Sequence, residues 1–128
     1  MDQEFKVLYE KAKALTGEKV LNNNVSYAQV GVALLTEQGN IYTGISIIAH
    51  CGIGFCAEHS AIAEMLKNNE DRILKIVATD KDGACPPCGR CRELIKQVNI
   101  ENMKTQIMIS EDEVYTLEEL LPHAWILK

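Results

Sequence analysis

Four residues in two short segments have the types and spacing of a catalytic metal site. Cys56 and Glu58 lie in the segment CAE, and Cys88 and Cys91 lie in the segment PCGRC at 87–91. Cys88 and Cys91 are three residues apart and would share one face of a helix, which suits chelation of a single ion. With Cys56 as a third ligand, tetrahedral zinc keeps one position open for water, as catalytic zinc sites do.

Glu58 is the candidate proton carrier for that water. On a regular helix the side chains of Cys56 and Glu58 would point about 200° apart, so both can approach one ion only from the first turn of a helix that begins at Cys56. A loop followed by a helix also places unpaired N–H groups and the positive end of the dipole near the thiolates. Thiolates reduce the acidity of the metal, and three side chains are candidates for the compensating charge: Arg90, Arg92 and protonated His59.

The same cysteines allow two other metal sites. Cys85, Cys88 and Cys91 form CxxCxxC, which with Cys56 could ligate an iron–sulfur cluster. A CxxC pair alone often holds a structural zinc ion. Neither alternative accounts for Glu58 beside Cys56, so we favour the catalytic zinc site.

The other cysteines and the histidines are not expected to bind metal. Cys51 and Cys85 are predicted to be small apolar side chains near the site. Since no histidine has metal-ligand spacing to another, surface or hydrogen-bonded roles are expected for His50, His59 and His123.

Helices that could position these residues are predicted where apolar side chains recur at helical spacing. This pattern covers residues 3–15, 56–68 and 88–98. Thr116 and Glu119 form a capping box for a brief last helix that stops near Pro122. The second and third helices would therefore begin at cysteines of the candidate site.

Runs of Val, Ile and Leu predict a sheet of five strands. They cover residues 28–36, 41–48, 73–79, 105–110 and 114–116, and the first two form a hairpin. Loops are expected at 49–55 and 80–87. Because strands alternate with helices after the opening hairpin, we expect a mixed sheet covered by helices on both faces.

Composition is typical of a single globular domain over residues 1–128. The length of 128 residues is below the roughly 150 expected per domain. The chain is 47% hydrophobic and 24% charged, a balance that excludes intrinsic disorder. A net charge of −5 without a basic run disfavours nucleic acid as a partner.

A cytoplasmic location without a membrane partner is expected. The longest apolar stretch, near residues 30–35, is broken by Gly31 and falls well short of the roughly 20 residues of a membrane span. The N-terminus, MDQEFKVLYE, lacks the features of a signal peptide. The odd number of cysteines, five, favours metal ligands or reduced thiols over a disulfide framework.

CAE at 56–58 followed by PCGRC at 87–91 is the metal-binding pattern of zinc deaminases. The chain resembles the short cytidine deaminase family, which includes blasticidin S deaminase, over nearly its whole length. VGVALLTEQGNIYTG at 30–44 looks like the opening hairpin of the family, CAEHSAIAEML its first metal helix, PPCGRCRELI its second and LEELLPHAW its C-terminal turn. The resemblance implies a three-layer α/β/α fold, one zinc ion per chain, a homotetramer and hydrolytic removal of an exocyclic amine.

The resemblance also implies substrate contacts. The Ala57 backbone would contact the exocyclic amine, and Trp125 stands where relatives carry an aromatic side chain that reaches the pocket of a neighbouring subunit. The Asn and Glu that hold the ribose in nucleoside-deaminating relatives fall on Ser46 and Ile48, and an aromatic residue near the base falls on Ala28. Since Ile48 cannot hydrogen-bond a hydroxyl group, we expect a reshaped pocket.

Together these patterns predict a zinc-dependent hydrolase that converts a ring amine to a carbonyl and releases ammonia. Cys56, Cys88 and Cys91 would bind the zinc, and Glu58 would move the proton. The expected substrate is cytidine, deoxycytidine or an analogue such as blasticidin S, with a place in pyrimidine salvage. The alternative is a metal-stapled protein that binds a small molecule without turnover.

Overall fold

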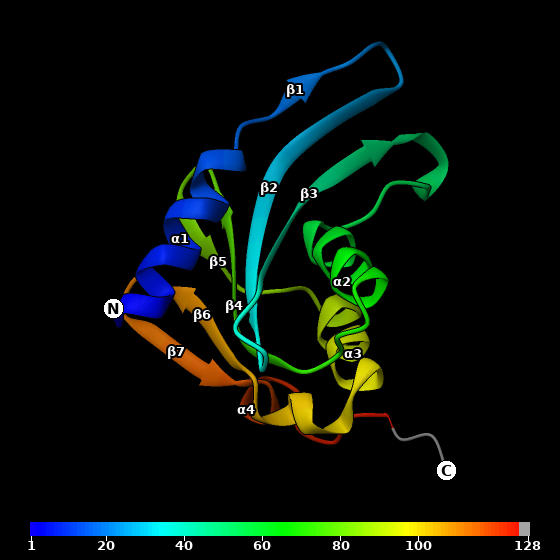
Figure 1. Ribbon diagram of the computed structural model, residues 1–128. Helices are drawn as coiled ribbons and strands as arrows, with labels where there is room; N and C mark the ends of the chain where they lie inside the picture. The colour runs from blue at the N-terminus through cyan, green and yellow to red at the C-terminus, as the bar shows by residue number, and fades with distance from the viewer. Residues whose placement is uncertain (126–128) are drawn as a thin grey trace.

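The structure, a computed structural model, describes residues 1–125 as a sheet between two layers of helices (Figure 1). The elements follow one another as α1 (Gln3–Leu15), β1 (Lys19–Val20), β2 (Val25–Thr36), β3 (Ile41–Ala49), α2 (Ala57–Lys67), β4 (Ile73–Asp80), β5 (Gly83–Cys85), α3 (Gly89–Val98), β6 (Gln106–Ser110), β7 (Glu113–Thr116) and α4 (Leu117–Leu120). α1 covers one face of the sheet, and α2 and α3 cover the other. Within these residues, no helix combines the length and the hydropathy that a membrane span needs.

The predicted helices and the opening hairpin are confirmed, as is the mixed sheet. The order of the strands is β1-β2-β4-β6-β7, with β3 paired to β2 and β5 paired to β4. β4 and β6 are parallel, whereas β2 is antiparallel to both β3 and β4. The capping box of the last helix is present, because Thr116 and Glu119 each bond the backbone N–H of the other.

The prediction of five strands is wrong, because within residues 1–125 the sheet has seven. β1 has two residues and β5 has three, and strands this short show no hydrophobic alternation that a sequence pattern could detect. β5 lies in the segment 80–87 that was expected to be a loop. It pairs with β4 just before the chain reaches Cys88, and so it helps to fix the start of α3.

Alternate residues of β2 face two separate cores, as the period of a strand requires. Val32 and Leu34 pack with α2 and α3 in a cluster that includes Ala61, Ile62, Met65, Ile76, Ile95 and Ile107. Ala33 and Leu35 pack with α1 in a cluster that includes Phe5, Leu8, Ala12, Val77 and Met108. Burial of each large aliphatic side chain contributes roughly 1.5–3 kcal/mol, so these clusters hold the helices on the sheet.

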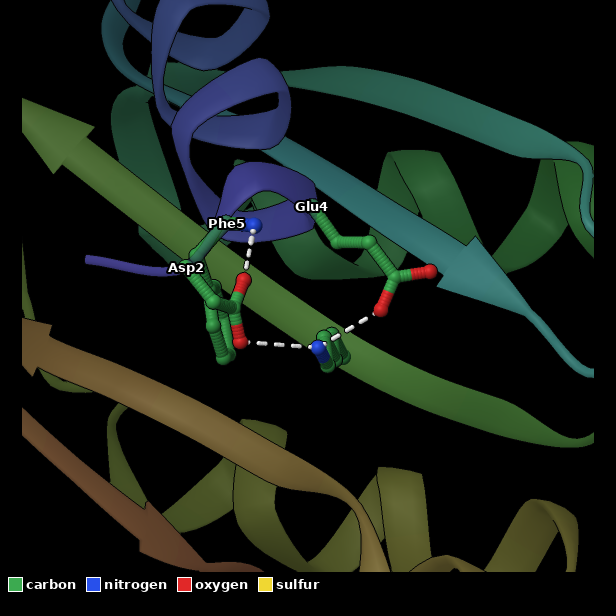
Figure 2. Close-up of polar contacts among 4 residues, drawn as sticks. Asp2, Glu4 and Phe5 are labelled. Atoms are coloured by element: carbon green, nitrogen blue, oxygen red, sulfur yellow. Dashed lines mark hydrogen bonds and ion pairs between the residues drawn. The ribbon is translucent and has the colours of Figure 1, made fainter.

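The N-terminus of α1 is fixed to β4 by a charged cluster (Figure 2). Asp2 caps the helix by accepting a 2.7 Å hydrogen bond from the backbone N–H of Phe5. The Lys75 ammonium lies 2.9 Å from the Asp2 carboxylate, 2.7 Å from the Glu4 carboxylate and 5.3 Å from the centre of the Phe5 ring. The bond from Phe5, followed by Lys75, lowers the pKa of Asp2 below its ordinary value.

α2 packs directly on the backbone of β3 at Gly44. A Cβ at this position would lie 2.5 Å from the Ala61 nitrogen and 2.6 Å from the Ala57 oxygen, which no side chain tolerates. The absence of a side chain at Gly44 therefore sets the distance between the sheet and the start of α2, where two candidate site residues lie.

Candidate metal centre and active site

The structure brings the three predicted thiol ligands together from two adjacent helices. Cys56 is the N-cap of α2, Cys88 is the N-cap of α3, and Cys91 lies in the first turn of α3. The Cys88 Sγ lies 3.6 Å from the Sγ atoms of both Cys56 and Cys91, and all three sulfurs lie within 4.8 Å of one another. Tetrahedral zinc with bonds of 2.3 Å separates its sulfur ligands by about 3.8 Å. The spacing therefore fits one zinc ion.

Cys56 is positioned by the loop between β3 and α2. Phe55 exchanges two backbone hydrogen bonds with Ile47, of 2.9 and 3.0 Å, so the residue just before Cys56 is attached to β3. A Cβ at Gly54 would collide with the Ile47 carbonyl oxygen, so this close approach requires glycine. The start of α2 is thereby held against the edge of β3.

Cys88 is positioned by Pro87 and Arg92. The Arg92 Nε donates a 2.8 Å hydrogen bond to the Pro87 carbonyl, and its Nη1 donates a 2.9 Å bond to the Leu120 carbonyl at the end of α4. Arg92 is one of the three candidates for the charge that compensates the thiolates, and its guanidinium is bound to these two carbonyl groups. Burial, followed by the charge of Arg90, lowers the pKa of His59, so this side chain is neutral at pH 7. Arg90 and the N–H groups of α3 remain as sources of positive charge.

The environment distinguishes the three thiols. Burial favours a raised pKa at Cys88, but hydrogen bonds to its sulfur, first from the backbone N–H of Cys91, outweigh burial and lower the pKa. Burial raises the pKa of both Cys56 and Cys91. A coordinated thiol is deprotonated by the metal itself, so the two raised values are compatible with ligation.

Glu58 lies in the first turn of α2 and is 4% exposed. Burial raises the pKa of its carboxyl group. Glu58, Cys56 and Cys88 line one cavity of about 440 Å³, a size typical of sites for small molecules. The arrangement therefore places a proton-transferring carboxyl group beside the thiol cluster, in space that a small substrate could enter.

The predicted substrate contacts fall in two places. Ala57, Ser46 and Ile48 line the cavity. Trp125 is not part of the cavity lining in the single chain, and its side chain is 59% exposed. Its backbone N–H donates a 3.3 Å hydrogen bond to Glu93, and its carbonyl oxygen accepts a hydrogen bond from Lys96.

Several lining residues were not predicted from the sequence, among them Val30, Ile47 and Phe55. Ile47 and Phe55 depend on the pairing of a loop with a strand, whereas Arg90, which also lines the cavity, was predicted as a candidate for the compensating charge. Cys85 also lines the cavity, but it lies outside the thiol cluster, as expected. It donates a hydrogen bond to the Ala78 carbonyl, and burial raises its pKa to about 11.

Comparisons with known proteins agree with this geometry. A family model described as the cytidine and deoxycytidylate deaminase zinc-binding region matches residues 4–107. Cytidine deaminase of Halalkalibacterium halodurans is 31% identical over 101 residues, which are 76% of each chain. Blasticidin-S deaminase of Bacillus cereus is 32% identical over 103 residues, which are 73% of this chain and 74% of the relative. The crystal structure of cytidine deaminase from Mycobacterium leprae has a TM-score of 0.78 and 28% identity, and the match covers 95% of this chain and all of that one (100%).

Proposed function

Because the chain belongs to the cytidine and deoxycytidylate deaminase family of zinc-dependent hydrolases, we propose that it removes the exocyclic amine of a cytosine-type nucleoside. Candidate substrates are cytidine, deoxycytidine and analogues such as blasticidin S, since the relatives include both a cytidine deaminase and a blasticidin-S deaminase. The observation that carries the proposal is the position of the buried Glu58 carboxyl group in the same cavity as the thiol cluster.

Cys56, Cys88 and Cys91 would hold the zinc ion, which supplies the acidity that makes water a nucleophile at neutral pH. Glu58 accepts the proton that the water loses and delivers it to the ring nitrogen next to the carbon under attack. Glu58 then takes the remaining proton of the attacking oxygen and passes it to the departing amine. The water oxygen becomes the new carbonyl, and the amine leaves as ammonia. The Ala57 backbone, which lines the cavity beside Glu58, would contact the amine.

The test is ammonia release by the zinc-loaded protein. We expect turnover of at least one member of a panel that contains cytidine, deoxycytidine, cytosine, blasticidin S and N4-substituted cytidines. If the protein retains stoichiometric zinc but releases no ammonia from any of them, it is a metal-stapled binding protein and not a deaminase.

We further propose that the chain forms one domain over residues 1–128 and assembles as a cytoplasmic homotetramer that acts in pyrimidine salvage. The exposed Trp125 indole supports assembly, because Glu93 and Lys96 hold the backbone of this residue while its side chain is free to reach a neighbouring subunit's cavity. The five unpaired cysteines are consistent with a reducing compartment. Measurement of the solution mass, which we expect to be four times that of the 14.3 kDa chain, tests the assembly.

A further inference from the structure

We propose that the cavity selects a cytosine-type ring whose N1 substituent lacks a vicinal diol, and that Ile48 determines this specificity. This inference rests on the proposed function, because the deamination chemistry fixes how the ring must lie. In an aminopyrimidine the carbon that bears the amine and the N1 atom lie on opposite sides of the ring. With the amine next to Glu58 and the thiol cluster, the N1 substituent points to the part of the cavity farthest from them.

We assign this part of the cavity to the end of β3, whose residues Ser46, Ile47 and Ile48 line the cavity. Ile48 lies four residues along β3 from Gly44, where α2 packs, which is roughly 13 Å for an extended strand. In Figure 1, β3 continues beyond the start of α2. Ile48 and Phe55 both line the cavity and are 42% and 39% exposed, so their apolar surfaces are available to a ligand. Val30 and Ile47 complete an apolar wall.

The hydroxyl group in this wall is already bonded within the protein. Ser46 is 6% exposed, and its Oγ accepts a 3.0 Å hydrogen bond from the Val30 N–H and donates to the Val30 carbonyl at 3.4 Å. These bonds support β2 at the register shift between Tyr27 and Gly31. Since a serine has one proton, at most one lone pair of Ser46 remains for a substrate.

Apart from Glu58, the described lining holds no buried carboxylate or amide that could bind a diol. Glu58 is the only carboxylate among the described residues that line the cavity, and it is needed for proton transfer. Gln29 and Arg90 are exposed and bond water in competition with any ligand. A diol next to Ile48 would therefore lose hydrogen bonds to water without gaining equivalent partners, and this loss disfavours its binding.

The first experiment compares 2′,3′-dideoxycytidine with cytidine by kcat/KM for ammonia release. We expect the dideoxy compound to be favoured by at least about tenfold. Equal values, or a preference for cytidine, would overturn the inference. Turnover of either compound supports the proposed function whatever the ratio, so the two claims fail separately. If neither is turned over, calorimetric titration of the two compounds decides, and tighter binding of cytidine or no binding of either overturns the inference.

The second experiment changes the wall. Ile48→Glu introduces a carboxylate that can accept hydrogen bonds from both hydroxyl groups of a diol, and we expect the ratio to move at least about tenfold toward cytidine. Ile53→Glu is the matched control, because Ile53 is 76% exposed in the neighbouring loop and does not line the cavity. An unchanged ratio in Ile48→Glu, or the same shift in both variants, contradicts the assignment. Ile48→Thr, a smaller change with the same expected direction, serves if the glutamate variant does not fold.

Discussion

The Sγ atoms of Cys56 and Cys88 lie 3.6 Å apart, although 32 positions separate the two residues in the chain. Each residue caps a different helix, α2 or α3, so one ion bound between them would join both helix starts. The stability of the site and the presence of the metal are therefore coupled.

Removal of zinc should lower the stability of the fold. A ligand that is present at 1,000 times its dissociation constant and binds only the folded state stabilises the fold by about 4 kcal/mol. We therefore expect a chelator to lower Tm by roughly 15 °C. Calorimetry with and without chelator measures the change. Cys88→Ser should abolish the response, whereas Cys51→Ser, at an exposed position outside the thiol cluster, should keep it. A chelator response that survives in Cys88→Ser would exclude Cys88 as a ligand.

Glu58→Gln should separate catalysis from metal binding. The amide keeps the shape of the side chain but cannot carry the proton, so we expect kcat to fall at least about a hundredfold while zinc content stays at one ion per chain. Elemental analysis and ammonia release measure the two quantities on the same sample. Turnover close to that of the unaltered protein at full zinc occupancy would remove Glu58 from the mechanism.

Asp2 should make stability depend on pH in the acid range. The pKa of Asp2 is lowered in the folded state. The carboxylate therefore contributes its full stabilisation above its ordinary pKa of about 3.9, and this stabilisation is lost as pH falls through the lowered pKa. Asp2→Asn keeps a capping side chain but not the charge that pairs with Lys75, and should cost less than about 1 kcal/mol at pH 7. Urea unfolding at pH 7 and pH 3 should show the difference between the two proteins shrinking at the lower pH.

Tyr42 should limit stability in the alkaline range. Its hydroxyl donates a hydrogen bond to the buried Glu70 carboxylate, and this bond raises the pKa of Tyr42 to about 12. The hydrogen bond contributes its full stabilisation below pH 10, the ordinary pKa of the tyrosine hydroxyl. This stabilisation is lost as pH rises from 10 to about 12, because in that range the hydroxyl of Tyr42 ionises in the unfolded state but not in the folded state. Tm of the unaltered protein should fall between pH 10 and 12, and Tyr42→Phe should show a shallower fall. Parallel profiles for both proteins would contradict this assignment.

Asn102 should be the most sensitive buried polar position outside the site. It is 0% exposed, its amide donates 3.0 Å hydrogen bonds to the carbonyls of Asp71 and Ile95, and its oxygen accepts a 2.8 Å bond from the Ile73 N–H. Asn102→Ala leaves these buried groups unpaired, so we expect a loss of about 3 kcal/mol in urea unfolding. Asn102→Asp should also destabilise, because a carboxylate would face two carbonyl oxygens. A loss below about 1 kcal/mol in both variants would contradict the assignment.

The clustering of Cys56, Cys88 and Cys91 could be predicted because the sequence signal for it lies in two short segments. The spacing of Cys88 and Cys91 and the start of a helix at Cys56 are properties of short segments, and the structure brings these residues together. The apolar wall of the cavity could not be predicted, because it depends on contacts between segments that are distant in the sequence. Phe55 enters the wall through its pairing with Ile47, which no periodicity in the loop at 49–55 indicates.

Strand boundaries show the same limit. The long runs of β2 and β4 are evident from their apolar residues, whereas β1 and β5 exist only because a neighbouring strand offers free backbone groups. The hydrogen bonds between Ser46 and Val30 could not be predicted either, since they join two strands where the register of β2 shifts. Sequence therefore predicts the grouping of the three cysteines better than it predicts the residues that line the rest of the cavity.

Gly44 carries no reactive group, yet a single methyl group at this position would displace α2, which carries part of the candidate active site. A substitution there would push α2 outward as a rigid body and carry Cys56 and Glu58 away from Cys88 and Cys91 together. Glu58 and Cys56 would keep their mutual geometry, while Cys56 would be separated from the other two members of the thiol cluster. Mutational damage at Gly44 would thus resemble a metal-binding defect, although Gly44 is neither a member of the thiol cluster nor part of the cavity lining.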